Sequence, residues 1–124
     1  MRVEASVTEV ITLTNSERTA AGLAPLRMNP CLADQVARPW GEHLARTGPL
    51  VHQDMQAALR KCPNLNGIGE NLAAGQNSPR EAVTDWMNSP GHRANLMNPS
   101  FDEIGVVRVV SGSGKIYWVQ IFGQ

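Results

Sequence analysis

Hydrophobic residues in the first third of the chain recur every three or four positions, the spacing that places them on one face of an α-helix. This pattern predicts a helix over 4–21, which ends at Gly22, and a second helix over 31–47. Pro39 lies inside the second pattern and predicts a kink there, because proline lacks the N–H that would bond to the Gln35 carbonyl. The apolar positions of the two helices are Val7, Val10, Ile11, Leu13, Leu32, Val36, Trp40 and Leu44.

The middle of the chain predicts shorter elements. A short helix over 53–61 is followed by a loop and then by GENLAAG, residues 69–75, which is typical of a short strand or a bend. Ser78 and Glu81 stand in the positions of a capping box, so a further helix is expected to begin there. Pro90 and the glycine after it are expected to break that helix.

The last quarter changes from helical periodicity to strands. Residues 104–110 and 116–122 flank SGSGK, which indicates a hairpin. Both faces of the second strand are apolar, so the sheet needs cover on both sides. Helices early and a doubly buried sheet late predict an α+β fold, a single-domain α-β-α sandwich over 1–124 with a mainly antiparallel central sheet. The two faces of the second strand carry Ile116, Trp118 and Phe122 on one side and Tyr117, Val119 and Ile121 on the other.

Charge and cysteine content narrow the class of protein. The formal net charge is zero, so no basic surface for nucleic acid is predicted, and no apolar run is long enough for a transmembrane segment. The N-terminus is amphipathic and carries acids, so either the protein stays inside the cell or a leader has been removed. Cys31 and Cys62 are the only cysteines. They are either two unpaired buried thiols or a disulfide that closes a loop of about 32 residues, worth roughly 3–4 kcal/mol.

Few residues are candidates for chemistry, since the chain contains no HExxH, GxSxG, Walker A or GxGxxG motif. The three histidines are His43, His52 and His92, and His43 is expected to be an ordinary helix residue. Taken alone, His52 and His92 are compatible with a structural role, such as packing or capping, as well as with a functional site. Glu70 is the one charged residue of an apolar stretch and therefore needs cationic, donor or metal partners. Two imidazoles and a carboxylate are a common ligand set for zinc.

Four quoted segments together resemble a known family. GENLAAG, WMNSPGHRANLMNPSFDEIGVV and YWVQIFG occur in this order after LVHQDM. In order and spacing they are similar to the bacterial branch of the CAP superfamily, the group with an SCP-like extracellular domain. The resemblance covers residues 7–122 and implies the α-β-α sandwich that the strand pattern predicts independently.

The resemblance also implies a cleft with histidines and acids. His52, Glu70 and His92 match three family positions, and the bend at Ser89 places His92 in the cleft. His52 and His92 would be the metal ligands, with zinc or another divalent cation as cofactor. The family's second acid has no counterpart here, because nothing assigns that role to the nearby Asp85.

Family membership further implies secretion or a place in the cell envelope, with the signal peptide absent from this chain, and a disulfide between Cys31 and Cys62. The expected function is a non-catalytic module that binds a lipid, a sterol, another small molecule or a partner; no oligomeric state is predicted. A metal-dependent hydrolase or peptidase that uses the same cleft is the first alternative. A purely structural role of the polar cluster, with function on the outer loops, is the second.

Overall fold

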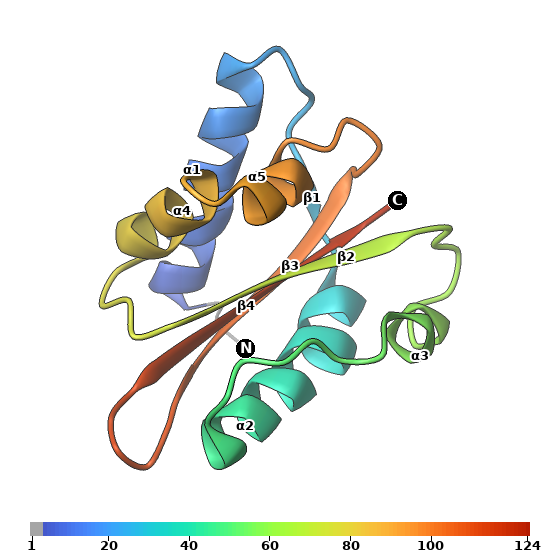
Figure 1. The fold of residues 1–124 in the computed structure, drawn as a ribbon. Helices are drawn as coiled ribbons and strands as arrows, with labels where there is room; N and C mark the ends of the chain where they lie inside the picture. Colours follow the sequence, from blue (N-terminus) through green and yellow to red (C-terminus); the bar gives the residue numbers. More distant parts are fainter. Residues whose placement is uncertain (1–3) are drawn as a thin grey trace.

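The computed structural model describes residues 4–124, which form helices and four strands in one continuous fold (Figure 1). The helices lie mostly in the first part of the chain, and the two longest strands lie at its end. In order they are α1 (Ala5–Ala20), β1 (Arg27–Met28), the π-helical turns η1 (Leu32–Ala37), α2 (Arg38–Thr47), α3 (Met55–Arg60), β2 (Ile68–Ala74), α4 (Pro79–Met87), α5 (Pro90–Leu96), β3 (Glu103–Val110) and β4 (Ile116–Gly123).

The four strands form one sheet in the order β1-β3-β4-β2. β4 pairs antiparallel with both β3 and β2, whereas β1 pairs parallel with β3. The predicted α+β class is confirmed, but the sheet is mixed rather than mainly antiparallel. The reason is the two-residue strand β1, which the sequence pattern did not indicate because so short a segment shows no alternation.

Helices cover both faces of this sheet, as the doubly apolar β4 requires. Figure 1 shows α1, α4 and α5 on one face and α2 and α3 on the other. Each face has its own core: one contains Trp86, Trp118 and Phe122, and the other contains Leu44 and Val119. The α-β-α sandwich is therefore confirmed. No helix within residues 4–124 combines the length and apolar character needed to cross a membrane.

Local signals set several helix ends as predicted. α1 ends at Ala20, and Gly22 follows with a φ of 81°, a left-handed conformation that favours glycine. The Ser78 hydroxyl accepts a hydrogen bond from the Glu81 N–H at the start of α4. Pro90, which was expected only to break a helix, also begins α5, because proline is well suited to the first turn.

A π-helical segment lies directly before Pro39, where the sequence predicts a kink. The backbone of η1 is widened over Leu32–Ala37 and then continues into α2, in whose first turn Pro39 lies. A π-helical segment shifts the hydrogen-bond register, which accommodates a residue that has no N–H to donate.

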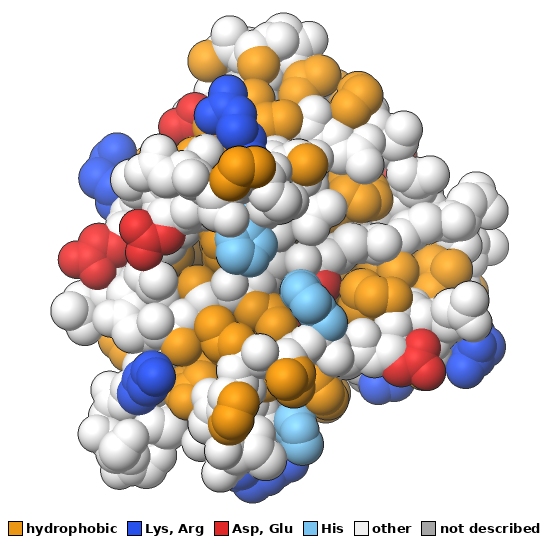
Figure 2. All heavy atoms as spheres, viewed as in Figure 1, with side chains coloured by type: hydrophobic (Ala, Val, Ile, Leu, Met, Phe, Trp, Pro, Cys, Tyr) orange, Lys and Arg blue, Asp and Glu red, His pale blue; other side chains and the backbone are white. Residues whose placement is uncertain are grey.

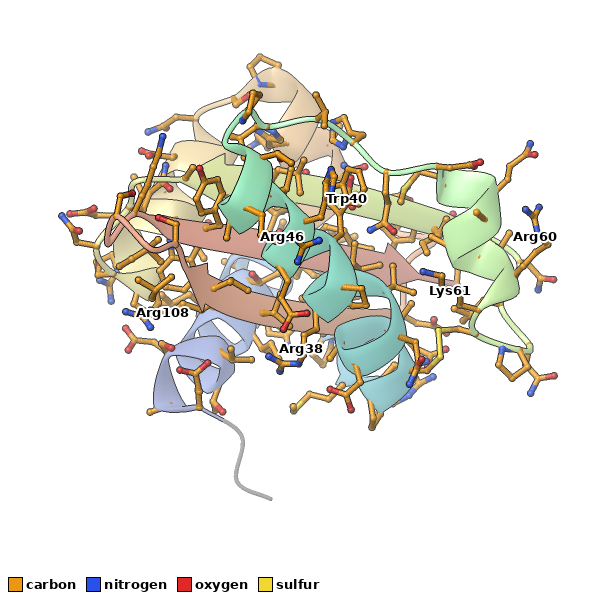
Figure 3. The ribbon with its side chains drawn as sticks, turned by 90° about the horizontal axis from the view of Figure 1, so that it is seen from below. Arg38, Trp40, Arg46, Arg60, Lys61 and Arg108 are labelled. Atoms are coloured by element: carbon orange, nitrogen blue, oxygen red, sulfur yellow. A yellow bond between two sulfur atoms is a disulfide. The ribbon has the colours of Figure 1, made fainter. Side chains whose placement is uncertain are left out.

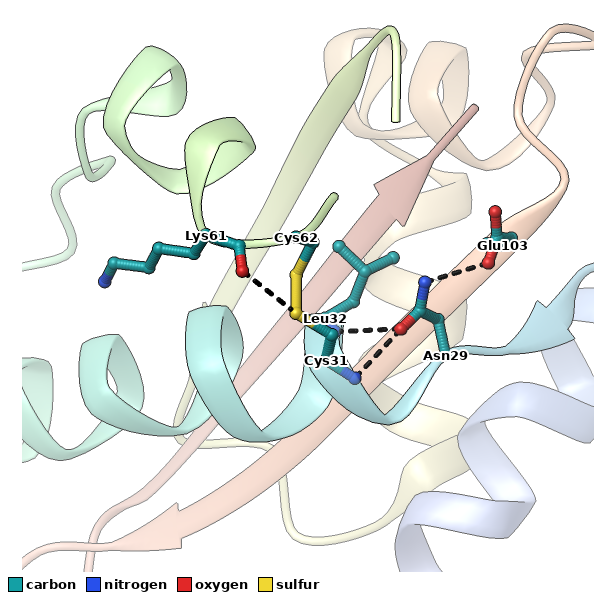
Figure 4. The surroundings of a disulfide bond; sticks show 6 residues. All are labelled: Asn29, Cys31, Leu32, Lys61, Cys62 and Glu103. Carbon is teal, nitrogen blue, oxygen red and sulfur yellow. Dashed lines mark hydrogen bonds between the residues drawn. A yellow bond between two sulfur atoms is a disulfide. The ribbon is translucent and has the colours of Figure 1, made fainter. Parts of the chain in front are cut away.

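A disulfide joins Cys31, directly before η1, to Cys62, just after α3 (Figure 4). The two Cα atoms are 5.8 Å apart, and the predicted pairing is confirmed. Asn29 holds the first turn of this helix, because its Oδ1 accepts from the N–H groups of Cys31 and Leu32. The disulfide therefore links the start of η1, which packs on β3, to the segment between α3 and β2.

Candidate functional site

Glu70 is the buried centre of the candidate site. It lies on β2, and only 4% of its surface is exposed. Its carboxylate accepts hydrogen bonds from His52 and Gln53, both in the loop before α3. The prediction that this buried carboxylate has donor partners is confirmed, and no metal is needed to satisfy it.

His52 makes the shortest of these contacts while most of its ring stays accessible. Its Nδ1 lies 2.8 Å from Glu70 Oε1, and the side chains of His52 and Glu70 are 61% and 1% exposed. Because a carboxylate only accepts, Nδ1 carries the proton of this bond. In the neutral imidazole the Nε2 lone pair is then left for another partner, and no hydrogen bond within residues 4–124 uses it.

Gln53 is a site residue that the sequence reasoning missed. Its backbone N–H donates to Glu70 Oε1 at 3.3 Å, and its side-chain Nε2 donates to Oε2 at 2.8 Å. The same Nε2 lies 3.3 Å from the Val36 carbonyl in η1. Gln53 thus fixes the carboxylate from a second direction and links it to the π-helical turns. Only its position directly after His52 could have indicated from the sequence that Gln53 belongs to the site.

His92 lies in α5, on the other side of β2 from α3, and is half-buried. Its backbone carbonyl accepts from Asn71 Nδ2 at 3.1 Å, which ties α5 to β2. Burial, and then the nearby charge of His52, lower the pKa of His92 below its ordinary value of 6.5. The two imidazoles are therefore close enough to influence each other. Figure 2 shows all three histidines on one face of the molecule.

Asn71 and Gln120 belong to a buried hydrogen-bond network. Asn71 Nδ2 donates to Gln120 Oε1 at 3.1 Å, and Gln120 Nε2 donates to Thr14 Oγ1 of α1 at 2.9 Å. Asn95 Nδ2 donates to Asn71 Oδ1 and to the Glu70 carbonyl. This network connects α1, the sheet and α5, so it braces the backbone on which Glu70 and His92 stand.

Arg18 is a second residue that the sequence did not single out. It is 1% exposed on α1, and its guanidinium donates to four backbone carbonyls, at Ala24, Leu96, Asn98 and Phe101. Burial lowers the pKa of Arg18. Ala24 lies in the loop after α1, whereas the carbonyls of Leu96, Asn98 and Phe101 end α5 and form the turn into β3, so Arg18 holds in place the helix that carries His92.

The remaining candidates lie outside this arrangement. Asp85 is exposed and accepts from Gln76 Nε2. The His43 ring stacks on Trp40 in α2. Ser89 precedes α5, and its side chain makes no capping hydrogen bond. The role predicted for Ser89 stays a prediction.

Within this cluster, two side chains are left that could donate to a metal ion. Both oxygens of Glu70 are already used by His52 and Gln53, which leaves the imidazoles of His52 and His92 as the available donors. Among residues 4–124, no three His, Cys, Asp or Glu side chains form a group that could hold a metal ion. A divalent cation here would therefore keep open positions for water or a ligand.

Comparison with known proteins gives matches over nearly the whole chain. The family model described as "CAP: Cysteine-rich secretory protein family" matches residues 11–122. The chain is 38% identical over 128 residues to the protein YkwD of Bacillus subtilis (strain 168), an alignment that covers 97% of this chain and 48% of YkwD. The chain thus spans about half the length of that curated relative.

Solved structures agree in fold. An outer surface protein from Borrelia burgdorferi superposes with a TM-score of 0.89 at 23% identity, covering 100% of this chain and 96% of that chain. An extracellular protein containing an SCP domain from Bacillus anthracis superposes with a TM-score of 0.82 at 26% identity, covering 96% and 40% of the two chains.

Proposed function

Because the chain belongs to the CAP family of cysteine-rich secretory proteins, we propose that it is an extracellular, non-catalytic binding domain. In this proposal the imidazoles of His52 and His92 hold a divalent cation, with zinc as the best match to the donors. The adjacent surface binds a lipid, another small molecule or a partner. The observation that carries the proposal is the contact of 2.8 Å between His52 Nδ1 and the buried Glu70 carboxylate.

This contact prepares His52 to act as a ligand. A carboxylate that accepts from Nδ1 fixes the tautomer and the orientation of the ring, and it makes the other nitrogen more basic. Glu70 can hold that position because Gln53 donates to both of its oxygens. A bound cation would supply Lewis acidity and open coordination positions, whereas the chain supplies two neutral imidazoles and the buried carboxylate behind one of them.

Apolar side chains next to His52 support a ligand with an apolar part. Leu50 and Val51 directly precede His52, and 44% and 51% of their surfaces are exposed. Large hydrophobic residues that stay exposed in a group often mark a binding surface. A ligand whose polar group binds at the imidazoles could place its apolar part on these two side chains.

The disulfide supports a location outside the cell. Disulfides persist in oxidising compartments and are rare in the reducing cytosol. The similar protein from Bacillus anthracis is described as extracellular. We therefore propose that the chain acts after secretion.

Zinc titration of the metal-free protein is the test. We expect micromolar binding at neutral pH, absent in a His52→Ala/His92→Ala double variant and unchanged in His43→Ala, the matched control. Glu70→Gln is expected to weaken binding about 10- to 100-fold, because the ring of His52 loses its fixed tautomer. Binding should also weaken as the pH falls, since only a neutral imidazole binds a metal.

Two results would contradict the proposal. The first is zinc binding that survives in the double variant. The second is no binding to the wild type together with a lower melting temperature of the double variant. That second result would assign the two histidines to the structural role.

The pKa of His92 gives an independent prediction about stability. Because the folded pKa lies below the unfolded value of about 6.5, the unfolded state binds more protons between these two values. Above pH 6.5 His92 is neutral in both states and takes nothing from the free energy of unfolding. As the pH falls through the folded pKa, the folded state is destabilised relative to the unfolded state. Urea unfolding between about pH 7.5 and pH 5 should therefore show a smaller loss of stability for His92→Gln than for the wild type. Parallel curves for the two proteins would show that His92 does not carry this dependence.

A further inference from the structure

A hollow lies at the edge of the sheet where β1 ends. β1 pairs only with Glu103 and Ile104 at the start of β3, and the chain then continues into η1. Beyond that point α1 packs against β3 from one face of the sheet and η1 packs against it from the other. The space that remains between α1 and η1 has a volume of about 230 Å³. The hollow therefore exists because β1 is too short to fill it.

Most of the lining of this hollow is apolar. α1 contributes Val7 and Ile11, and β3 contributes Ile104 and Val106. Val7 and Ile11 each keep 7% of their surface exposed, and Met28 of β1, which lines the same hollow, is 52% exposed. Apolar surface that water still reaches favours a ligand that covers it, because the displaced water returns to bulk solvent.

The volume of the hollow limits the size of its ligand. An apolar protein cavity of about 150 Å³ holds one benzene molecule. A hollow of about 230 Å³ therefore has room for one ring with one or two small substituents. Sites for drug-sized ligands have volumes of about 300–1,000 Å³, so a sterol or a long acyl chain would not fit inside this hollow.

Three exposed charged side chains line the hollow, and their charges are compensated. Asp34 Oδ1 lies 4.0 Å from Arg38 Nε, and Glu4 Oε1 lies 4.0 Å from Arg108 Nη1. In Figure 3, Arg38 lies between α1 and the start of α2. A ligand of either charge would meet a like charge here. An uncharged hydroxyl group can donate to a carboxylate or accept from a guanidinium, so it suits both kinds of group.

The hollow is separate from the histidine site. Glu70 lies on β2, which is at the opposite edge of the sheet from β1 in the order β1-β3-β4-β2. The residues that line the hollow come from α1, β1, η1, α2 and β3 and from the segments directly next to them. A ligand bound here would therefore occupy an additional site, and its binding would not depend on a metal ion at His52 and His92.

We propose that the hollow between α1 and η1 binds a small uncharged molecule with one ring-sized apolar group and one hydroxyl group, such as a substituted phenol. The ring packs against Val7 and Ile11 on one side and against Ile104 and Val106 on the other. The hydroxyl group faces the exposed charged side chains and exchanges hydrogen bonds with them. The ligand is a free small molecule, because the volume of the hollow does not admit a ring that is joined to a peptide backbone.

Titration with p-cresol, followed in methyl NMR spectra, tests this proposal. We expect a Kd of about 1 mM or tighter, with shifts at the methyl groups of Val7, Ile11, Ile104 and Val106. Nuclear Overhauser effects from the p-cresol methyl group to Ile11 and Ile104 are expected as well, and they need no variant of the protein. Ala33 lines the hollow from η1, so Ala33→Leu fills part of the space and should weaken binding about tenfold or more.

Matched controls separate the hollow from other surfaces and from other ligands. Ala20→Leu adds the same side chain at an exposed position of α1 and should change the Kd by no more than about twofold. N-acetyltyrosinamide carries the same ring on a peptide unit and should bind about tenfold more weakly than p-cresol, because the peptide unit has no space. The anion p-toluate and the cation p-methylbenzylammonium should also bind more weakly.

The His52→Ala/His92→Ala protein should bind p-cresol with the Kd of the wild type, so a failure of the proposed metal site leaves this result unchanged. Four results would overturn the proposal: no methyl shifts at about 10 mM p-cresol, shifts centred on Leu50 and Val51 next to His52, tighter binding of any of the three analogues, or undiminished binding to a folded Ala33→Leu protein. If Ala33→Leu does not fold, the nuclear Overhauser effects decide, and their absence at Ile11 and Ile104 would contradict the proposal.

Discussion

Replacing Arg18 with methionine is expected to lower the free energy of unfolding by about 3–5 kcal/mol. Methionine fills much of the same space but donates no hydrogen bonds, so the carbonyls of Leu96 and Phe101 lose the Arg18 donor in a buried place. Urea unfolding followed by tryptophan fluorescence measures the effect. This large cost is expected because one guanidinium holds several carbonyls at the end of α5 and in the turn after it, although the Asn98 carbonyl also accepts from the Phe101 N–H at 3.3 Å.

An exposed arginine provides the control for this substitution. Arg80 lies on the surface of α4, and Arg80→Met is expected to change the free energy of unfolding by no more than about 0.5 kcal/mol. Arg18→Lys should fall between the two, because an ammonium group can reach some of the carbonyls but lacks the planar fork. A loss for Arg18→Met as small as that for Arg80→Met would show that the carbonyls find other partners.

The second large effect is expected for Gly105→Ala, near the start of β3. A Cβ atom at this position would lie 2.4 Å from the Ala33 nitrogen and 2.6 Å from the Leu32 carbonyl carbon. Both neighbours are backbone atoms of η1, so no side chain can move aside. We expect a loss of about 3 kcal/mol or more in the free energy of unfolding, because η1 would have to move away from the sheet.

Gly112→Ala is the matched control, since a Cβ atom there would meet nothing within 4 Å. Its free energy of unfolding should stay within about 0.5 kcal/mol of the wild type. The same measurements on Gly105→Ala also test the site. Displacement of η1 would move the Val36 carbonyl that contacts Gln53, so zinc binding should weaken together with stability. If the free energy of unfolding of Gly105→Ala equalled that of Gly112→Ala, the claim that η1 packs closely on β3 at Gly105 would be contradicted.

Local sequence signals were sufficient for most elements and for the layers. The spacing of apolar residues, the glycine after α1 and the capping box at Ser78 predicted helices that the structure contains. The two apolar faces of β4 predicted cover on both sides, and the sandwich follows from that requirement. These features depend on neighbours within a few positions, so the amino-acid order alone determines them.

The mixed sheet and the π-helical turns depended on tertiary contacts. β1 is a strand only because Arg27 and Met28 lie beside β3, more than seventy residues later in the chain. η1 lies directly against the sheet because Gly105 has no side chain there. β1 leaves no periodic pattern in its own segment, and Pro39 indicated an irregularity in the second helix but not its π-helical form.

The candidate site divides in the same way. The sequence itself identified His52, Glu70 and His92 as unusual, because titratable groups stood at a bend or in an apolar stretch and because their motifs resemble those of a family. Only the tertiary structure showed that Glu70 uses both oxygens on His52 and Gln53, and that Arg18 holds the end of α5. The physical reason is that a buried polar group must find its partners in space. Those partners lie on other elements, at sequence separations from 17 to 83 residues.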